Sequence, residues 1–316
     1  MHFVYYLEMD VIDLIDLSPV REHESKEKQF LSFLTIQRLC MQEKPFFIGR
    51  LSGNEPYFCG LVYKQQEVPQ YLIHNMLTGA GIHFASNEDA IEYVRTYLKS
   101  FKNCDLVGVY NDGGGMYNQS IEFYKIIRAL FSKFTPICAN GLFVFNHINS
   151  SEYQFYKVFE NKKVLVISSH CETIKSQLPK FDKLFKIPVF HSSTQFYVHK
   201  PPQQNAGSHD LQSWQFHFEK LKNEIKYIQS TEFDFDIALV SCGGFGMPIS
   251  AYINENLNKS VIYFGATLQL CFGVTGQRWL SVPQDEVNMH LNEHWVRPLE
   301  VDKPKNINLC EGGCYW

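Results

Sequence analysis

Glycine, charged and hydroxyl residues follow directly after several predicted strands of this 316-residue chain. Buried apolar runs that alternate with helical patterns are typical of a parallel sheet. The carboxyl ends of parallel strands meet at one edge of the sheet, where open α/β proteins bind their ligands. We therefore expect one crevice with glycine N–H donors, an arginine and two or three carboxylates. The segments expected at this edge are 50–55, 112–115, 169–172, 243–246 and 265–269.

The glycine loops are the clearest signal. Gly243, Gly244 and Gly246 follow a predicted strand and open a helix from about residue 247, and Gly265 begins the next loop. Glycine lets backbone N–H groups approach a phosphate at a helix N-terminus, which predicts a nucleotide or nucleotide-sugar site. The alternative is that these glycines only make tight turns. Their spacing matches neither a phosphate-binding P-loop nor the dinucleotide fingerprint.

The segment RLSGNE brings a cation and a carboxylate together in six residues. The guanidinium of Arg50 suits a diphosphate oxygen, and Glu55 suits a general base or a ligand of a divalent cation. Ser52, Gly53 and Asn54 lie between them and are predicted to line the donor site. The alternative is an ordinary surface ion pair.

Two further loops carry candidate acid and base groups. NDGGG contains Asp112, a predicted catalytic residue, and Gly113 and Gly114, predicted to approach the donor closely. The alternative for this loop is a flexible turn. His170 follows another strand and is predicted at the donor site, although a lone histidine at a strand end is as often structural.

The C-terminal part supplies additional polar groups. Gln269, Arg278 and Arg297 are predicted to bind the donor, and Trp295 beside Arg297 could stack on a ring. Both Arg297 and Trp295 could equally be packing residues that dock the tail.

Composition excludes some classes of partner. The formal net charge of -4 gives no basic field for a nucleic-acid backbone. No apolar run reaches the roughly 18 residues of a membrane span, and no secretory signal is visible, so we expect a cytoplasmic protein without a transmembrane segment. The nine cysteines are scattered and odd in number, which favours reduced, buried thiols.

The expected fold class is α/β, a Rossmann-like, mostly parallel sheet flanked by helices. We expect one domain over 1–316, with a soft division near 146–162. Strands are predicted at 46–49, 105–110, 163–168, 187–191, 236–241 and 261–264. Helices are predicted at 24–44, 56–64, 87–102, 118–132, 173–185 and 211–228 and from about 247, with a glycine-bearing loop at 77–84.

Several strings resemble one enzyme family. RLSGNE, GAGIHF, SCGGFGMPI, FGATLQLCFGVTGQRW and the tail that ends in CEGGCYW resemble glycosyltransferases of the GT-D fold, more closely a bacterial and viral branch, over residues 46–316. The resemblance implies transfer of a sugar from a nucleotide diphosphate sugar, most often a UDP-sugar. The family loop reads Arg-x-Gly-Asp-Gly-Glu, and its Asp-x-Glu pair binds a divalent metal such as manganese. Arg50 and Glu55 match that loop, but the metal-binding aspartate falls on Gly53.

Two functions follow from this reading. The first is a glycosyltransferase, a hexosyl- or pentosyltransferase of polysaccharide biosynthesis, acting on a glycan or glycolipid acceptor. Its metal, Mn or Mg, would rest on Glu55, completed by Asp112 or water, or else arginines and N–H groups neutralise the diphosphate without metal. The second is a degenerate module that binds a nucleotide sugar or glycan without turning it over. A phosphatase is the weakest reading, because no nucleophile stands in a phosphate loop.

Overall fold

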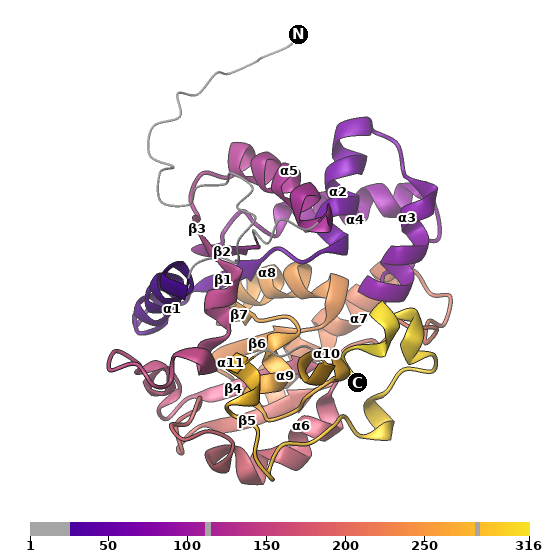
Figure 1. Cartoon of the computed structure of the whole chain (residues 1–316). Coiled ribbons are helices and arrows are strands. Elements are labelled where there is room, and N and C mark those ends of the chain that lie inside the picture. Colours follow the sequence, from indigo (N-terminus) through magenta and orange to yellow (C-terminus); the bar gives the residue numbers. More distant parts are fainter. Residues whose placement is uncertain (1–25, 111–114, 282–284) are drawn as a thin grey trace.

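The computed structural model describes residues 26–110, 115–281 and 285–316 (Figure 1). Seven strands form one sheet in the order β3-β2-β1-β7-β6-β4-β5, and every pairing is parallel. This confirms the predicted Rossmann-like α/β class. The strands are β1 (Phe47–Arg50), β2 (Leu106–Val109), β3 (Thr135–Cys138), β4 (Lys163–Ser168), β5 (Gln195–His199), β6 (Ile237–Ser241) and β7 (Ser260–Tyr263).

Helices flank both faces of the sheet, as Figure 1 shows. One face carries a core cluster with α2 (Asn54–Gln65), α4 (Asn87–Lys99), α5 (Gly115–Leu130), α7 (Trp214–Tyr227) and α8 (Gly246–Leu257). The other face carries α1 (Lys26–Cys40), α6 (Cys171–Gln177) and α9 (Thr267–Cys271). The remaining α-helices are α3 (Gln70–Asn75), α10 (Gln277–Ser281) and α11 (Asp285–Asn288).

Local sequence explains most element boundaries. The central strands β1, β2 and β7 are buried along their whole length, because helices cover both faces. Helix α4 begins where Ser86 Oγ accepts a hydrogen bond from the Asp89 N–H at 3.2 Å, which caps the first turn. The Asp89 carboxylate in turn accepts a hydrogen bond from the N–H of Ala85 at 2.9 Å, one residue before the N-cap.

Three sequence predictions are wrong. Residues 187–191 are not a strand, because Pro188 has no N–H to donate to a ladder and Phe190 is instead buried among other aromatic rings. The edge strand in this region is β5. The predicted loop at 77–84 begins inside a π-helical turn, Met76–Ala80, that continues α3, and the helix predicted at 173–185 becomes a 3-10 helix after Gln177.

Both halves of the chain contribute to the same sheet. Strand β1 from the first half pairs with β7 from the second, so Phe47 lies opposite Val261. The soft division predicted near 146–162 falls in the turns that lead to β4, and it remains a prediction. Among the described helices, none is both long and apolar enough to cross a lipid bilayer.

Candidate functional site

The carboxyl ends of β1 and β7 lie at a switch point of the sheet. The chain leaves β1 toward β2, whereas β7 is reached from β6 on the opposite side. At such a point the connections diverge and leave a crevice at the carboxyl edge of the sheet. Arg50 is the last residue of β1 and Tyr263 the last of β7.

The guanidinium of Arg50 lies between two tyrosine rings. Its carbon is 5.3 Å from the centre of the Tyr110 ring and 5.5 Å from that of Tyr263. Its Nη1 donates a hydrogen bond to the Tyr110 hydroxyl. Burial opposes the charge, but the two tyrosine oxygens outweigh this effect and raise the pKa of Arg50 above its ordinary value. Arg50 is therefore a permanent cation held by aromatic faces.

This cation lacks a carboxylate partner within the described residues. Arg50 is only 9% exposed, no ion pair within 4.0 Å joins it to a described acid, and its Nε has no hydrogen-bond partner. Buried charges are normally paired, because desolvation without compensation is costly. The arrangement fits an anion that approaches from the carboxyl edge.

Gly265 makes room for the arginine. Its φ is +61°, and a Cβ there would lie 2.1 Å from Arg50 Nη2. Any side chain would be strained by the backbone and would displace the guanidinium. Gly265 was predicted to let a phosphate approach the backbone, but in the structure the space beside it is filled by the guanidinium of Arg50.

Glu55 is the buried carboxylate of the same region. It is 4% exposed in the first turn of α2, where Ser52 Oγ donates to its Oε2 at 2.5 Å. Burial raises the pKa of Glu55, although the hydrogen bond from Ser52 and the charge of Arg50 oppose the rise. A carboxylate with a raised pKa is a stronger base when it is ionised. Arg50, Glu55, Tyr110 and Tyr263 are called the Arg50 site below.

The 243–246 loop adjoins this site, but protein atoms fill the space beside its glycines. A Cβ on Gly243 would meet the Ala80 carbonyl oxygen at 2.6 Å, and one on Gly246 would meet the Tyr263 ring at 2.3 Å. A Cβ on Gly244 would collide with Ile82 at 2.4 Å. Internal packing therefore explains these glycines, and their presence alone no longer argues for a ligand.

Tyrosine hydroxyls also hold this loop from the protein side. Tyr263 donates to the carbonyl of Gly243 at 3.2 Å and Tyr93 to that of Gly244 at 2.9 Å. The loop leads into α8, whose N-terminus offers the favourable end of a helix dipole to an anion. The predicted role of the loop in donor binding stays a prediction.

His170 lies at the carboxyl end of β4. It is 6% exposed, its Nε2 has no hydrogen-bond partner, and its ring is 6.1 Å from that of Trp316. Burial lowers the pKa of His170 to about 4, so the ring is neutral at physiological pH. Its place at the sheet edge agrees with the prediction, and its role is open.

The remaining predicted polar residues contact the C-terminal segment. Gln269 donates to the carbonyls of Val274 at 3.2 Å and Tyr315 at 3.3 Å. Arg278 binds the Tyr315 hydroxyl at 3.1 Å and pairs with Glu311.

Trp295 and Arg297 hold the C-terminal segment against the rest of the protein. Arg297 donates to the carbonyl oxygen of Trp316 and to Gln277, the latter at 3.4 Å. Trp295 donates to Leu184 O at 3.1 Å and packs on Phe185. In this structure these two residues dock the tail, which is the alternative that the sequence left open.

The remaining predicted site residues either lie in the loop after β1 or fall outside the described residues. Gly53 precedes α2, and the Asn54 side chain lies beside Gly79, 2.7 Å from where a Cβ would stand. Asp112, Gly113 and Gly114 lie outside the described residues.

Potential metal ligands are few among the described residues. No group of three or more His, Cys, Asp or Glu side chains comes together among them. At the Arg50 site the carboxylate is Glu55, already hydrogen-bonded to Ser52, and Gly53 stands where the resemblance expects an aspartate. We therefore derive no step through a metal.

The sequence reading missed the tyrosines. Tyr110 follows β2, and Tyr263 is the last residue of β7. Both strands flank β1, so the two tyrosines can be predicted to meet at Arg50 only when the strand order is known. Tyr315 and Glu311 were missed for a similar reason, since they reach Arg278 from the far end of the chain.

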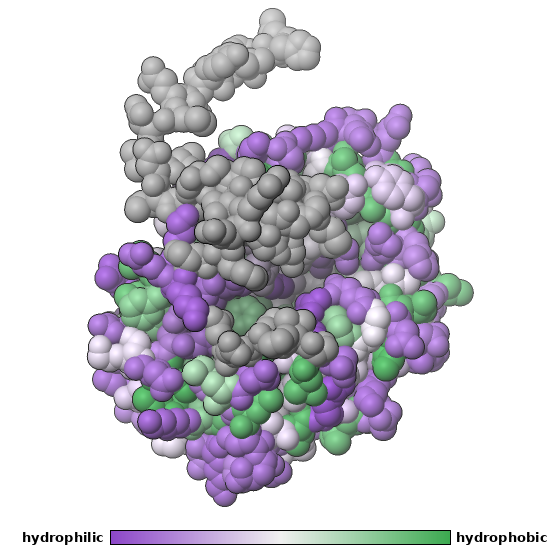
Figure 2. Space-filling model, viewed as in Figure 1, coloured by the Kyte–Doolittle hydropathy of each residue, from purple (hydrophilic) through white to green (hydrophobic). Residues whose placement is uncertain are grey.

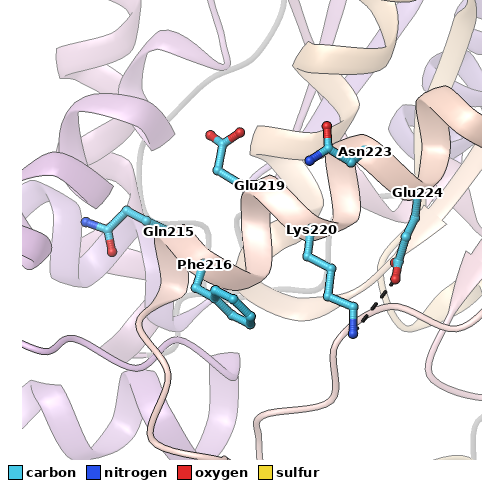
Figure 3. A pocket seen from close by; sticks show the side chains of 6 residues that line it. All are labelled: Gln215, Phe216, Glu219, Lys220, Asn223 and Glu224. Atoms are coloured by element: carbon cyan, nitrogen blue, oxygen red, sulfur yellow. Dashed lines mark ion pairs between the residues drawn. The ribbon is translucent and has the colours of Figure 1, made fainter.

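A depression of about 540 Å³ lies elsewhere, along α7. Figure 3 shows that all six of its labelled residues come from this helix, with Lys220 and Glu224 paired at 3.9 Å. A flank of one helix brings no groups together from different elements, so we do not assign it the function. The face seen in Figure 2 mixes hydrophilic and apolar residues and is hollowed near its centre.

Comparison with protein-family models, with curated proteins and with solved structures found no match to this chain. The function is therefore inferred from the chemistry of the residues. The nine cysteines form no disulfide, and all but Cys314 are buried.

Proposed function

We propose that the protein is a glycosyltransferase whose Arg50 site receives the diphosphate of a nucleotide sugar, with a UDP-sugar as the first candidate. The observation that carries the proposal is the buried guanidinium of Arg50, which has no carboxylate partner in the described part of the chain. A diphosphate supplies the missing negative charge and several acceptor oxygens. The resemblance to GT-D enzymes at the same loop agrees with this assignment.

In this proposal two residues carry the chemistry. Glu55 takes the proton of an acceptor hydroxyl while that oxygen attacks the anomeric carbon of the donor. The bond from that carbon to the diphosphate breaks, and the nucleoside diphosphate leaves with the electron pair. Arg50 stabilises the charge that develops on the leaving group, in a site from which water is largely excluded. No described carboxylate competes with the diphosphate for Arg50 within 4.0 Å.

The test is a panel of UDP, GDP and CMP sugars incubated with the purified protein, each with EDTA or with manganese. We expect release of the free nucleotide from one donor class, because water or an acceptor takes the sugar. Turnover in EDTA would support neutralisation by arginine. No turnover across the panel with any acceptor would count against the transferase.

A binding module is the second candidate, and one observation favours it. Gly53 replaces the metal-binding aspartate of the family loop. Such a protein would bind a nucleotide sugar at the same arginine and leave it intact. Turnover that disappears in Glu55→Gln would eliminate this candidate, whereas tight binding with no turnover under any condition would support it.

A further inference from the structure

The segment Cys310–Trp316, called the strap here, crosses the carboxyl edge of the sheet. At one end, Cys310 Sγ lies 3.8 Å from the carbonyl oxygen of Gly79, which faces Asn54 of the first loop. At the other end Trp316 faces His170. Figure 1 shows this yellow segment beside the purple segment around α3. The strap therefore lies next to the Arg50 site.

Three side chains fasten the middle of the strap. Arg278 pairs with Glu311, and it also donates to the Tyr315 hydroxyl at 3.1 Å. That hydroxyl donates to the Glu311 carboxylate at 3.1 Å. The Arg278 guanidinium lies 4.6 Å from the centre of the Tyr315 ring, so cation, ring and carboxylate form one closed set of contacts.

The backbone at Glu311 is unfavourable for a glutamate. Its φ is +48°, and Gly312 and Gly313 follow with φ of +66° and +78°. Glycine would adopt this left-handed conformation at lower cost. The carboxylate thus reaches Arg278 from a residue with an unfavourable backbone conformation.

The strap joins the two arginines. Tyr315 touches Arg278 directly and is close enough to Arg50 to interact with it electrostatically. Arg278 and Glu311 keep 36% and 40% of their side-chain surface exposed, so solutes can reach this pair. Arg278 is therefore a second guanidinium in contact with the strap, already occupied by a carboxylate of the protein.

We propose that Glu311 is an internal competitor for the anionic substrate: its carboxylate occupies Arg278, and an incoming diphosphate displaces it and loosens the strap. This inference rests on the proposed function, because it concerns the same site. Arg278 is already a predicted donor-binding residue, and the inference adds that Glu311 controls its availability.

The experiment measures the Kd of UDP and of inorganic pyrophosphate by calorimetry for the full chain and its variants. Glu311→Gln removes the charge and keeps the shape, and we expect it to bind UDP about two- to fivefold more tightly, the range for an exposed ion pair. In an Arg278→Gln background this gain should vanish. Glu300→Gln is the matched control, because Glu300 pairs with Lys303 in an exposed position of the same tail.

The outcomes separate the two proposals. If wild type binds UDP and Glu311→Gln binds it no more tightly, the inference is overturned and the proposed function stands. If pyrophosphate binding tightens in Glu311→Gln but UDP does not bind, the inference is upheld and the nucleotide assignment fails. No binding by any variant overturns both. If Glu311→Gln folds poorly, Glu311→Gly is used instead. It also removes the charge, and glycine suits the positive φ at this position. It must give the same increase in affinity for UDP.

Discussion

Arg50 is a full positive charge with almost no water around it. Two tyrosine faces and one hydroxyl stabilise it in the structure. Aromatic faces compensate a desolvated cation only in part, since a cation–π contact contributes about 0.5 to 2 kcal/mol. A bound anion would compensate the rest of the desolvation cost, and this is the physical basis of the proposed donor site.

The Arg50 position depends on the absence of a side chain at residue 265. We expect Gly265→Ala to lower the free energy of unfolding by about 2 kcal/mol or more, through the left-handed backbone together with the clash. Nucleotide binding should fall in parallel. Gly312→Ala is the matched control, because its φ is +66° but nothing lies within 4 Å of the added Cβ. Chemical unfolding of both variants checks this, and equal losses would show that Arg50 is not constrained by Gly265.

Glu55 should oppose stability while it supports catalysis. Its pKa is raised by burial, so the ionised form disfavours the folded state, and stability falls as pH rises through that range. We expect Glu55→Gln to raise the melting temperature at neutral pH, with a gain that shrinks toward acid pH, and to reduce transfer by about a hundredfold or more.

The control for this variant is Glu122→Gln. That carboxylate is exposed and paired with Lys64 and Lys125, so the change should leave transfer unaffected. A Glu55→Gln protein that loses stability and keeps its activity would contradict both roles of Glu55.

At the scale of elements, a buried aspartate joins the tail to the sheet. Asp302 is fully buried and accepts hydrogen bonds from the N–H groups of Glu172 and Thr173 and from the Thr173 hydroxyl. These N–H groups open α6, so the tail caps the helix that follows β4.

Removing this cap should destabilise the protein without touching the Arg50 site. We expect Asp302→Ala to cost about 2 to 3 kcal/mol of unfolding free energy, because buried N–H groups lose their acceptor. Asp182→Ala, an exposed aspartate of the neighbouring 3-10 helix, should change stability by no more than about 0.5 kcal/mol. Denaturant unfolding measures both, and similar values would refute the capping role.

Sequence patterns predicted the central elements well and the edges poorly. Strand β4 was predicted with its observed bounds, and β1, β2, β6 and β7 within one or two residues, because buried parallel strands are continuous apolar runs. The edge strands β3 and β5 were missed, since their burial is incomplete and the apolar signal correspondingly weak. Arg50 and Glu55 were predicted as site residues from their loop, and both are buried in the structure. Their tyrosine partners needed the strand order, and the Glu311 contact needed the path of the tail.

At the scale of the whole molecule, a buried neutral histidine predicts acid sensitivity. Burial lowers the pKa of His170 to about 4, so between about pH 6.5 and 4 the unfolded chain binds a proton that the folded protein does not. Stability contributed by the neutral ring is present above that window and is lost as pH falls through it. His147 acts in the same direction, with a pKa of about 4.

We expect His170→Gln to reduce the loss of unfolding free energy between neutral and acid pH by up to about 3 kcal/mol. This is the free energy that corresponds to the lowered pKa of His170. His74→Gln, an exposed histidine, should leave the profile unchanged. Melting temperatures from pH 7.5 to about 4 test this. An unchanged slope in His170→Gln would mean that His170 takes up its proton in the folded protein as readily as in the unfolded chain.

The most direct test of the Arg50 site is calorimetric titration of UDP into wild type and Arg50→Met. Methionine fills much of the same space without the charge, and loss of an unpaired buried cation should leave stability equal or higher. We expect wild type to bind and Arg50→Met to bind at least about thirtyfold more weakly, the loss typical of a desolvated charge contact. Arg95→Met, an exposed arginine, should bind as wild type. Equal affinity of wild type and Arg50→Met would contradict the claim that this arginine receives the diphosphate.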